Sequence, residues 1–264
     1  MYVIGERING MWVDIKKAIV EQDEGPIREW TEKQIAAGAD ALDVNVGPAT
    51  SKQVEALTWM CGIIRDINAD IPIALDSAKW DVMKEAVPQV AGPKIINSSK
   101  ADPEILANYC ALAAEHDCAL IGLTIDSRGI PTDVDSRVEM GATILTMAME
   151  AGLTPDKIFI DAIIQPVNVA PKQPLPVMKA MEQLKIMSDP PPHMVLGLSN
   201  VSQGAREREL INRTYIAMAV PAGLDAAIMD PCDKDLMDAA ITAELIMEKM
   251  IYCDSYIEAY MANK

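Results

Sequence analysis

Histidine and aromatic side chains are scarce in this sequence, which has two histidines and a single phenylalanine among 264 residues. His116 falls at the end of an expected helix and His193 precedes an expected strand, so neither is placed to act as a catalytic base. The five cysteines are an odd number and are widely spaced, which disfavours a disulfide framework. Cys110 and Cys118, which flank His116, lack the ligand spacing of a zinc site. We therefore expect neither a disulfide framework nor a metal centre.

Long uncharged apolar segments are also missing, and no stretch is long enough to span a bilayer. The first seven residues already include an acid and a base, which does not fit a secretory signal. We expect a cytoplasmic protein that is not held in a membrane. The net charge of −16 repels phosphate backbones, so we expect no nucleic-acid ligand. This charge favours solubility. The alternative interpretation is that it attracts a partner protein with a positively charged surface.

Short β-like runs recur along the chain, and segments with helical spacing separate them. The expected strands are Tyr2–Ile8, Ala41–Val46, Ile71–Asp76, Lys94–Ser98, Ala119–Ile125, Ile158–Ile164, Met194–Ser199 and Asp225–Met229. The expected helices include Pro26–Ala37, Val54–Ile67, Pro103–Glu115, Arg137–Ala151, Pro176–Ile186 and Lys234–Met250. Asp102 before Pro103 is typical of a helix start, and Gly38 is typical of a helix end.

Eight strand–helix units of about 33 residues each predict a parallel sheet within an α/β fold. Eight such units can close into a (β/α)₈ TIM barrel, which would occupy residues 1–264 as a single domain. A doubly wound open sheet is the alternative. The first strand is not followed by the G-x-G-x-x-G spacing of a dinucleotide site, which counts against that alternative.

The active site of such a barrel lies where the strands end, and polar residues gather at these positions. They are Glu6, Arg7 and Asn9, then Asp43 and Asn45, Asp76, Asn97, Thr124 and Asp126, Asp161 with Gln165 and Asn168, Ser199 to Gln203, and Asp230. Carboxylates and carboxamides suit a flat heterocycle edged with donors and acceptors, such as a pterin. For any one residue, the alternative of a helix cap or a turn is about equally plausible. The sequence shows no obvious acid with a pKa near neutrality.

Five ordered motifs resemble the pterin-binding methyltransferases. They are Gly5-Glu6-Arg7-Ile8-Asn9, Leu42-Asp43-Val44-Asn45-Val46-Gly47, Leu75-Asp76-Ser77, Ile96-Asn97-Ser98 and Gly197-Leu198-Ser199-Asn200-Val201-Ser202. The sequence is most similar to the methyltetrahydrofolate:corrinoid/iron-sulfur protein methyltransferases, whose relatives include methyltransferase II of anaerobic O-demethylase systems. The resemblance runs from the first strand to the segment Tyr252-Cys253-Asp254-Ser255.

The resemblance implies a dihydropteroate synthase-like pterin-binding barrel, a homodimer, and (methyl)tetrahydrofolate as the substrate. It implies that Asp76, Asn97 and Asp161 hold the pterin and that Asn200 approaches N-5, the nitrogen that carries the methyl group. The other residues implied as folate contacts are Gly197, Ser199, Gln203 and Arg208. Asn200 is the expected catalytic residue, because a polar group aimed at developing charge stabilises a transition state. A proton relay involving Asp43 is a further expectation.

The methyl group is expected to move between N-5 and the cobalt of a corrinoid that a separate protein carries. Corrinoid proteins that bind cobalt through histidine share a D-x-H-x-x-G motif, and neither His116 nor His193 lies in one. This chain should therefore not carry its own corrinoid. The reaction could serve acetyl-group synthesis or O-demethylation, which are opposite directions of the same transfer.

Two other functions remain open at this point. One is a pterin-condensing enzyme of the dihydropteroate synthase type, which Asn200 disfavours because that enzyme has a lysine on its seventh strand. The other is a non-catalytic folate-binding protein, which would use the same strand-end residues.

Overall fold

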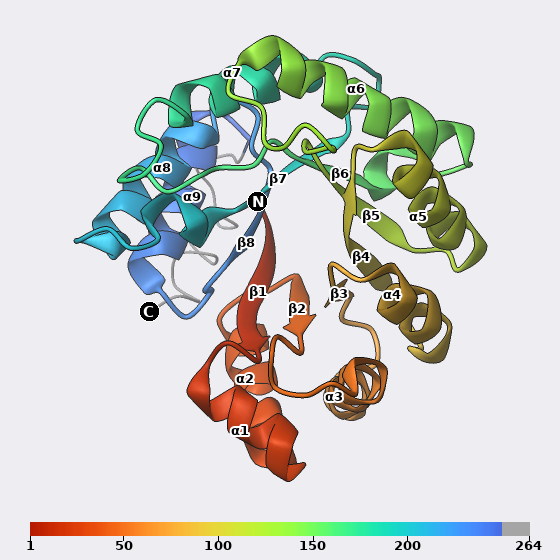
Figure 1. Cartoon of the computed structure of the whole chain (residues 1–264). Helices are drawn as coiled ribbons and strands as arrows, with labels where there is room; N and C mark the ends of the chain where they lie inside the picture. The colour runs from red at the N-terminus through yellow and green to blue at the C-terminus, as the bar shows by residue number, and fades with distance from the viewer. Residues whose placement is uncertain (250–264) are drawn as a thin grey trace.

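A computed structural model describes residues 1–249, in which eight parallel strands pair in sequence order and close into a barrel. The (β/α)₈ prediction is confirmed, and Figure 1 shows the strands around the centre with the helices outside them. The strands are β1 (Tyr2–Asn9), β2 (Ala41–Asn45), β3 (Ile73–Asp76), β4 (Lys94–Lys100), β5 (Ala119–Leu123), β6 (Ile158–Asp161), β7 (His193–Gly197) and β8 (Ala226–Met229). All eight correspond to expected strands.

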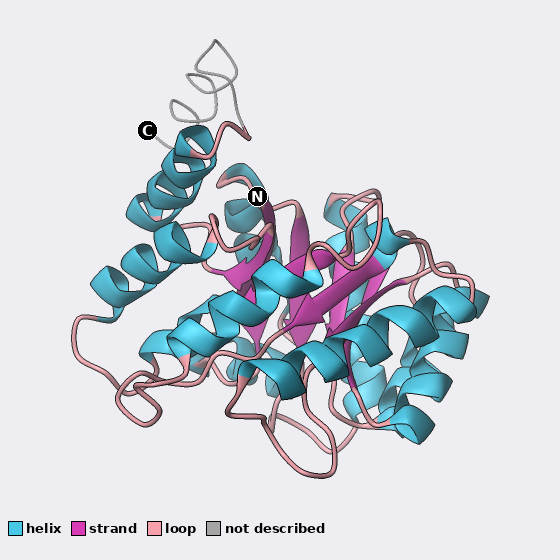
Figure 2. Cartoon of the chain, turned by 90° about the horizontal axis from the view of Figure 1, so that it is seen from above, coloured by secondary structure: helices cyan, strands magenta, loops and turns pink. Residues whose placement is uncertain are grey.

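The helices cover the outside of the barrel, where their buried side chains pack against those of the strands (Figure 2). They are α1 (Val13–Glu21), α2 (Glu24–Ala36), α3 (Gln53–Ile67), α4 (Trp80–Ala86), α5 (Pro103–Glu115), α6 (Val134–Glu150), α7 (Pro174–Leu184), α8 (Arg208–Ala219) and α9 (Lys234–Ile246). Short 3₁₀ turns are η1 (Val87–Gln89), η2 (Pro155–Lys157) and η3 (Leu198–Ser202). None of the helices in residues 1–249 combines the length and the apolar character needed to cross a membrane.

The expected helix boundaries hold closely at several ends. Helix α5 has the expected bounds, with Asp102 at the N-cap position, although the Asp102 side chain makes no capping hydrogen bond. Gly38 follows α2 with φ of +92°, a conformation that glycine adopts without steric cost. Met250, the expected end of the last helix, lies outside the described residues, as does the Tyr252–Ser255 segment.

A layer of apolar side chains fills the barrel interior, and every strand contributes one residue to it. These residues are Ile4, Ala41, Ala74, Ile95, Ile121, Phe159, Val195 and Ala226. Side chains two residues apart on a strand point to the same face. The next inward position on each strand therefore lies directly above this layer, toward the carboxyl ends of the strands.

The opposite end of the barrel, which we call the bottom, carries a compact group of paired side chains. The rings of Phe159 and His193 stack with centroids 4.6 Å apart. Asp225 accepts hydrogen bonds from Lys185 Nζ (2.6 Å) and Met194 N (2.7 Å) and contacts His193 Nδ1 (3.1 Å). Burial opposes ionisation of Asp225, but the bonds from His193 and Lys185 outweigh it and hold its pKa below the ordinary value. His193 is thus the first residue of β7, and its contacts are structural.

Candidate functional site

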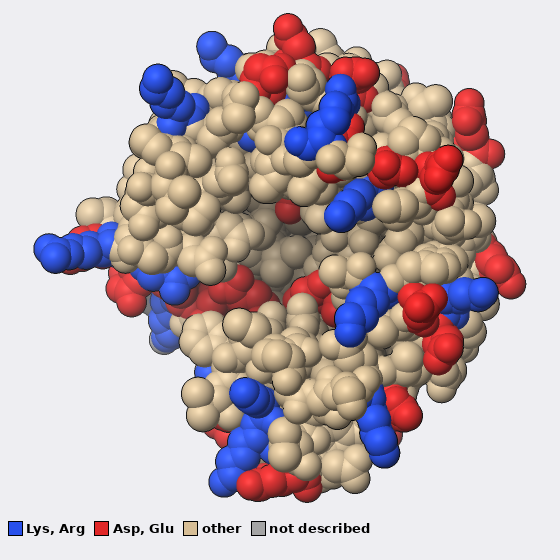
Figure 3. All heavy atoms as spheres, viewed as in Figure 1, with Lys and Arg blue, Asp and Glu red and all other residues tan. Residues whose placement is uncertain are grey.

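A cavity of about 990 Å³ opens at the carboxyl ends of the strands, which we call the mouth. Its floor is formed by the inward residues two positions beyond the apolar layer, one from each strand: Glu6, Asp43, Asp76, Asn97, Leu123, Asp161, Gly197 and Ile228. Figure 3 shows acidic atoms inside the central hollow, with lysine and arginine side chains around it. The period of the strands therefore brings residues far apart in sequence into one polar ring.

Neutral amides hold two carboxylates of this floor. Asn97 Nδ2 donates to Asp43 Oδ1 at 2.8 Å, and Asn45 Nδ2 donates to Asp76 Oδ2. Burial raises the pKa of both carboxyls, and the nearby charge of Asp76 raises the pKa of Asp43 further. Neither carboxylate forms a salt bridge among the described residues.

Asp161 lies on the other side of the floor at the end of β6, and only 8% of it is exposed. Burial raises its pKa to about 6, although backbone N–H groups of Ile163 (2.7 Å) and Gly197 act in the opposite direction. Asp161 and the Asp43–Asn97 pair thus present buried acceptors whose partners on the protein are all neutral. Such groups suit a ligand that brings several N–H donors.

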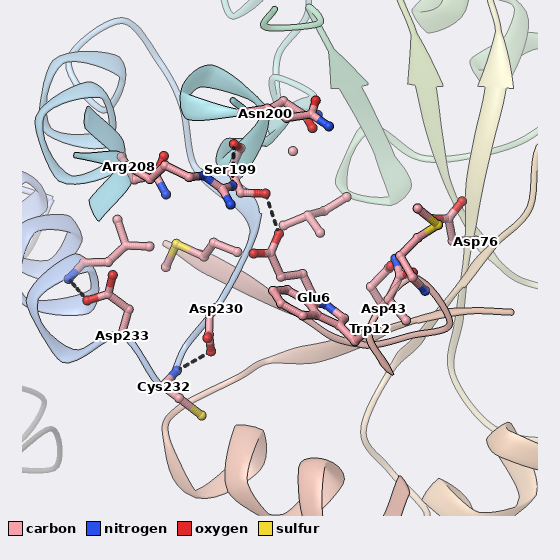
Figure 4. A pocket seen from close by; sticks show the side chains of 18 of the residues that line it. Glu6, Trp12, Asp43, Asp76, Ser199, Asn200, Arg208, Asp230, Cys232 and Asp233 are labelled. Atoms are coloured by element: carbon pink, nitrogen blue, oxygen red, sulfur yellow. Dashed lines mark hydrogen bonds between the residues drawn. The ribbon is translucent and has the colours of Figure 1, made fainter. Parts of the chain in front are cut away.

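The η3 turn forms one wall of the cavity and carries Ser199 and Asn200, with Gln203 directly after it. Gly197 makes room for this arrangement, because a Cβ atom there would lie 2.8 Å from Asn200 Nδ2. Arg208, the first residue of α8, braces the turn by donating to Ser202 Oγ (3.2 Å) and to the Ser199 carbonyl (3.3 Å). Asn200 is exposed, so its amide is free to meet a ligand in the cavity (Figure 4).

The structure brings together every residue that the sequence singled out for folate binding or catalysis. Asp43, Asp76, Asn97, Asp161, Gly197, Ser199, Asn200, Gln203 and Arg208 all line the cavity. Other residues expected at the strand ends are absent from its lining: Arg7, Asn45, Thr124, Asp126, Gln165, Asn168, Val201 and Ser202. Asp126 instead pairs with Arg128 at 2.7 Å, and β6 ends at Asp161, so Gln165 and Asn168 belong to the following loop. No metal-binding cluster occurs within residues 1–249.

Glu6 is a cavity residue to which the sequence analysis gave no role. Ser199 Oγ donates to Glu6 Oε2 at 2.9 Å, which links the first strand to the η3 turn (Figure 4). Burial raises the pKa of Glu6 to about 7, and the charge of Asp230 acts in the same direction. The expectation that the site has no acid with a pKa near neutrality is therefore wrong.

An apolar lip on the β1–α1 loop, formed by Met11 and Trp12, was also not expected. Gly10 lets this loop lie against β2, because a Cβ atom there would lie 2.0 Å from the Val46 carbonyl oxygen. The Arg7 guanidinium lies between the rings of Trp12 and Trp30, 4.1 Å from each centroid. These contacts hold Trp12 at the edge of the cavity, although 44% of it is exposed.

Comparison with known proteins finds relatives of this chain among pterin enzymes. Residues 15–230 match the family described as pterin binding enzyme. The chain is 30% identical to the methylcorrinoid:tetrahydrofolate methyltransferase of Eubacterium limosum, over 100% of this chain and 97% of that protein. It is 27% identical to the methionine synthase of Mycobacterium leprae, over 86% of this chain but only 20% of that longer protein. A dihydropteroate synthase from Coxiella burnetii, solved with pteroic acid, shares the fold with a TM-score of 0.71 at 17% identity, over 94% of each chain.

Proposed function

Because this chain belongs to the pterin-binding enzyme family, we propose that it is a methyltransferase that acts on tetrahydrofolate. The methyl group moves between N-5 of (methyl)tetrahydrofolate and the cobalt of a corrinoid that a separate protein delivers. The similarity to the Eubacterium limosum methyltransferase extends over the whole chain and supports this activity.

The observation that carries the proposal is the pairing of an acceptor-rich floor with an exposed asparagine on the wall. Asp76, Asn97 and Asp161 face one cavity from three strands and can receive the amino and amide N–H groups of a pterin. Asn200 on η3 lines the same cavity, and its amide can turn toward N-5. Gln203 and Arg208 line the same cavity and are proposed to contact the rest of the folate.

Methyl transfer from a tertiary amine needs N-5 to gain a proton, or nearly so, as the bond to carbon breaks. Asn200 cannot release a proton, but its amide can accept or donate a hydrogen bond as the charge on N-5 changes. Such a preorganised dipole stabilises the transition state more than the ground state. Asp43, on the floor of the cavity and with a raised pKa, is proposed to belong to the relay that carries the proton.

The cavity is open at the mouth, which suits a reaction partner that arrives with its own large cofactor. We propose that this partner is a corrinoid protein, that the chain itself forms a homodimer, and that residues 1–264 act as one domain. The enzyme is further proposed to work in the cytoplasm of an anaerobe. The same residues serve both directions, because a group that gives a proton to N-5 can also take it back.

Two alternatives use the same floor. A dihydropteroate synthase activity is disfavoured by Asn200, which occupies the strand-seven position where the resemblance places a lysine in that enzyme. A folate-binding protein without activity would show binding but no turnover.

The deciding experiment is stopped-flow methyl transfer between methyltetrahydrofolate and cob(I)alamin, with folate affinity measured separately by calorimetry. We expect turnover by the native chain and a loss on the order of 10²–10³ in rate for Asn200→Ala, the size seen when one preorganised donor is removed. Folate affinity should fall much less. Asn108→Ala, an exposed asparagine on α5, is the matched control and should keep the native rate. Folate binding without any methyl transfer would reject the proposed activity.

A further inference from the structure

Glu6 occupies a distinctive position among the carboxylates of the mouth. Its side chain extends from β1 into the cavity and meets Ser199, and Figure 4 shows the two side chains pointing toward each other. Ser199 directly precedes Asn200, the residue proposed to approach N-5. The Glu6–Ser199 contact therefore ends one residue from the proposed reaction centre.

The partner of Glu6 differs in kind from the partners of the other floor carboxylates. Asp43 receives its hydrogen bond from the amide of Asn97, and Asp161 receives one from the backbone N–H of Ile163. Amide and backbone N–H groups only donate, so these partners cannot exchange a proton with the carboxylates that they contact. A serine hydroxyl donates and accepts, and it can rotate between the two roles. Glu6 can thus give a proton to its neighbour or take one from it without a rearrangement of the backbone.

Charged groups from several elements act on Glu6. The two largest effects on the pKa of Glu6 are burial, which raises it, and the Ser199 hydrogen bond, which lowers it. Among the charged groups, Asp230 on the β8 side raises this pKa, while Arg208 on α8 and Arg7 on β1 lower it. The charge of Glu6 in turn raises the pKa of Asp43 on β2. Arg208 donates to Ser202 and to the Ser199 carbonyl, and no salt bridge joins it to Glu6 within residues 1–249. The balance leaves both protonation states of Glu6 accessible near neutral pH, since its pKa is about 7.

We propose that Glu6 stores the proton that N-5 gains or loses and exchanges it through the Ser199 hydroxyl. This inference rests on the proposed methyl transfer and names its proton source. When the methyl group leaves folate, the N-5–carbon bond breaks, its electron pair stays on N-5, and cobalt(I) supplies the pair for the new bond to carbon. Ser199 then gives its proton toward N-5 and receives the proton of the Glu6 carboxylic acid. In the reverse direction, N-5 bonds to carbon, the cobalt keeps the electron pair of the broken bond, and the N-5 proton returns to the Glu6 carboxylate through Ser199.

The test is the pH dependence of single-turnover methyl transfer in both directions, from pH 5.5 to 8.5, with methyltetrahydrofolate affinity measured at each pH. In the native chain, transfer from folate to cobalt should fall as pH rises through about 7, and transfer to folate should rise over the same interval. Glu6→Gln keeps the size and polarity of the side chain but cannot release a proton. It should lower the rate by about 100-fold or more, the usual contribution of a general acid, and remove the inflection. Glu182→Gln, on the exposed face of α7, is the matched control.

Two further variants keep the test informative even if Glu6→Gln does not fold. Asp230→Asn removes a like charge beside Glu6, so the inflection should move to lower pH. Ser199→Ala should resemble Glu6→Gln in its flat pH profile. An inflection that persists in Glu6→Gln, or that does not move in Asp230→Asn, would overturn the inference while leaving the methyltransferase activity in place. Absence of methyl transfer by the native chain would instead reject the proposed function itself.

Discussion

Asp225 at the bottom of the barrel is partly buried and Asp161 at its mouth is buried, but the two carboxylates have opposite surroundings. Asp225 meets the Lys185 ammonium and the His193 ring, and its pKa is lowered. Asp161 meets only backbone N–H groups, and its pKa is raised to about 6. The charged contacts at the bottom stabilise the fold. The carboxylates at the mouth have no such partners and remain available to a ligand, which lowers the free energy of unfolding. This division agrees with the general placement of function at the carboxyl ends of barrel strands.

The largest expected sign of this contrast is the pH dependence of stability. Glu6 has a folded-state pKa of about 7, above that of an unfolded glutamate, so its contribution is complete below about pH 4 and is lost as pH rises through 7. The free energy of unfolding should therefore fall by about 2.5 kcal/mol between pH 5 and 8 from Glu6 alone, with Asp161 adding to the fall. Asp225 has a lowered pKa and acts in the opposite sense, because its contribution is lost as pH falls below about 4.

Urea unfolding at each pH from 4 to 8 measures this effect. Glu6→Gln should flatten the decline toward alkaline pH, and Glu182→Gln should retain it. If the free energy of unfolding fell equally with pH in the native chain and in Glu6→Gln, ionisation of Glu6 would not lower stability. The contrast between the two ends of the barrel would then be lost.

The next effect in size concerns the bottom. Asp225→Ala removes the acceptor of a charged lysine and of a backbone N–H, so we expect a loss of about 1.5–3 kcal/mol in the free energy of unfolding. Asp66→Ala, which breaks an exposed pair with Arg28, is the control and should cost less than about 1 kcal/mol. Methyl transfer per folded molecule should be unchanged in both variants. A large fall in turnover for Asp225→Ala would show that the bottom also serves catalysis.

The smallest effect concerns ligand affinity at the mouth. Asp161→Asn keeps the size of the side chain but exchanges a charged acceptor for a neutral amide, so tetrahydrofolate affinity should fall about tenfold, or about 1.4 kcal/mol. Asp126→Asn is the matched control, because Asp126 also follows a strand but pairs with Arg128 outside the cavity. Calorimetry of both variants decides the matter, and an unchanged affinity in Asp161→Asn would remove Asp161 from the pterin contacts.

The strand ends were predictable from sequence because a single rule determines them. Each strand alternates inward and outward positions, so Ala41 in the apolar layer fixes Asp43 in the cavity floor, two residues further on. The rule fails where the strand ends sooner than its apolar run. β6 was expected to reach Ile164, but it stops at Asp161, which leaves Gln165 outside the cavity lining.

The environment of Glu6 was not predictable in the same way. Its pKa depends on burial and on a hydrogen bond to Ser199, 193 residues away in sequence. The loop with Met11 and Trp12 was missed for a different reason, because it belongs to no periodic pattern. A signal was present nonetheless, since Met11, Trp12 and Val13 form an apolar run between the first strand and the charged positions of α1.

The position of Trp12 gives the mouth a built-in optical reporter. Of the four tryptophans, all of which lie in the described part of the chain, Trp12 alone lines the cavity. Indole fluorescence is quenched by a nearby chromophore that absorbs at its emission wavelengths, and corrinoids absorb there. The arrival of a corrinoid at the barrel should therefore dim the emission of the unlabelled protein, and the Arg7 contact at 4.1 Å holds that indole in a defined place while it does so.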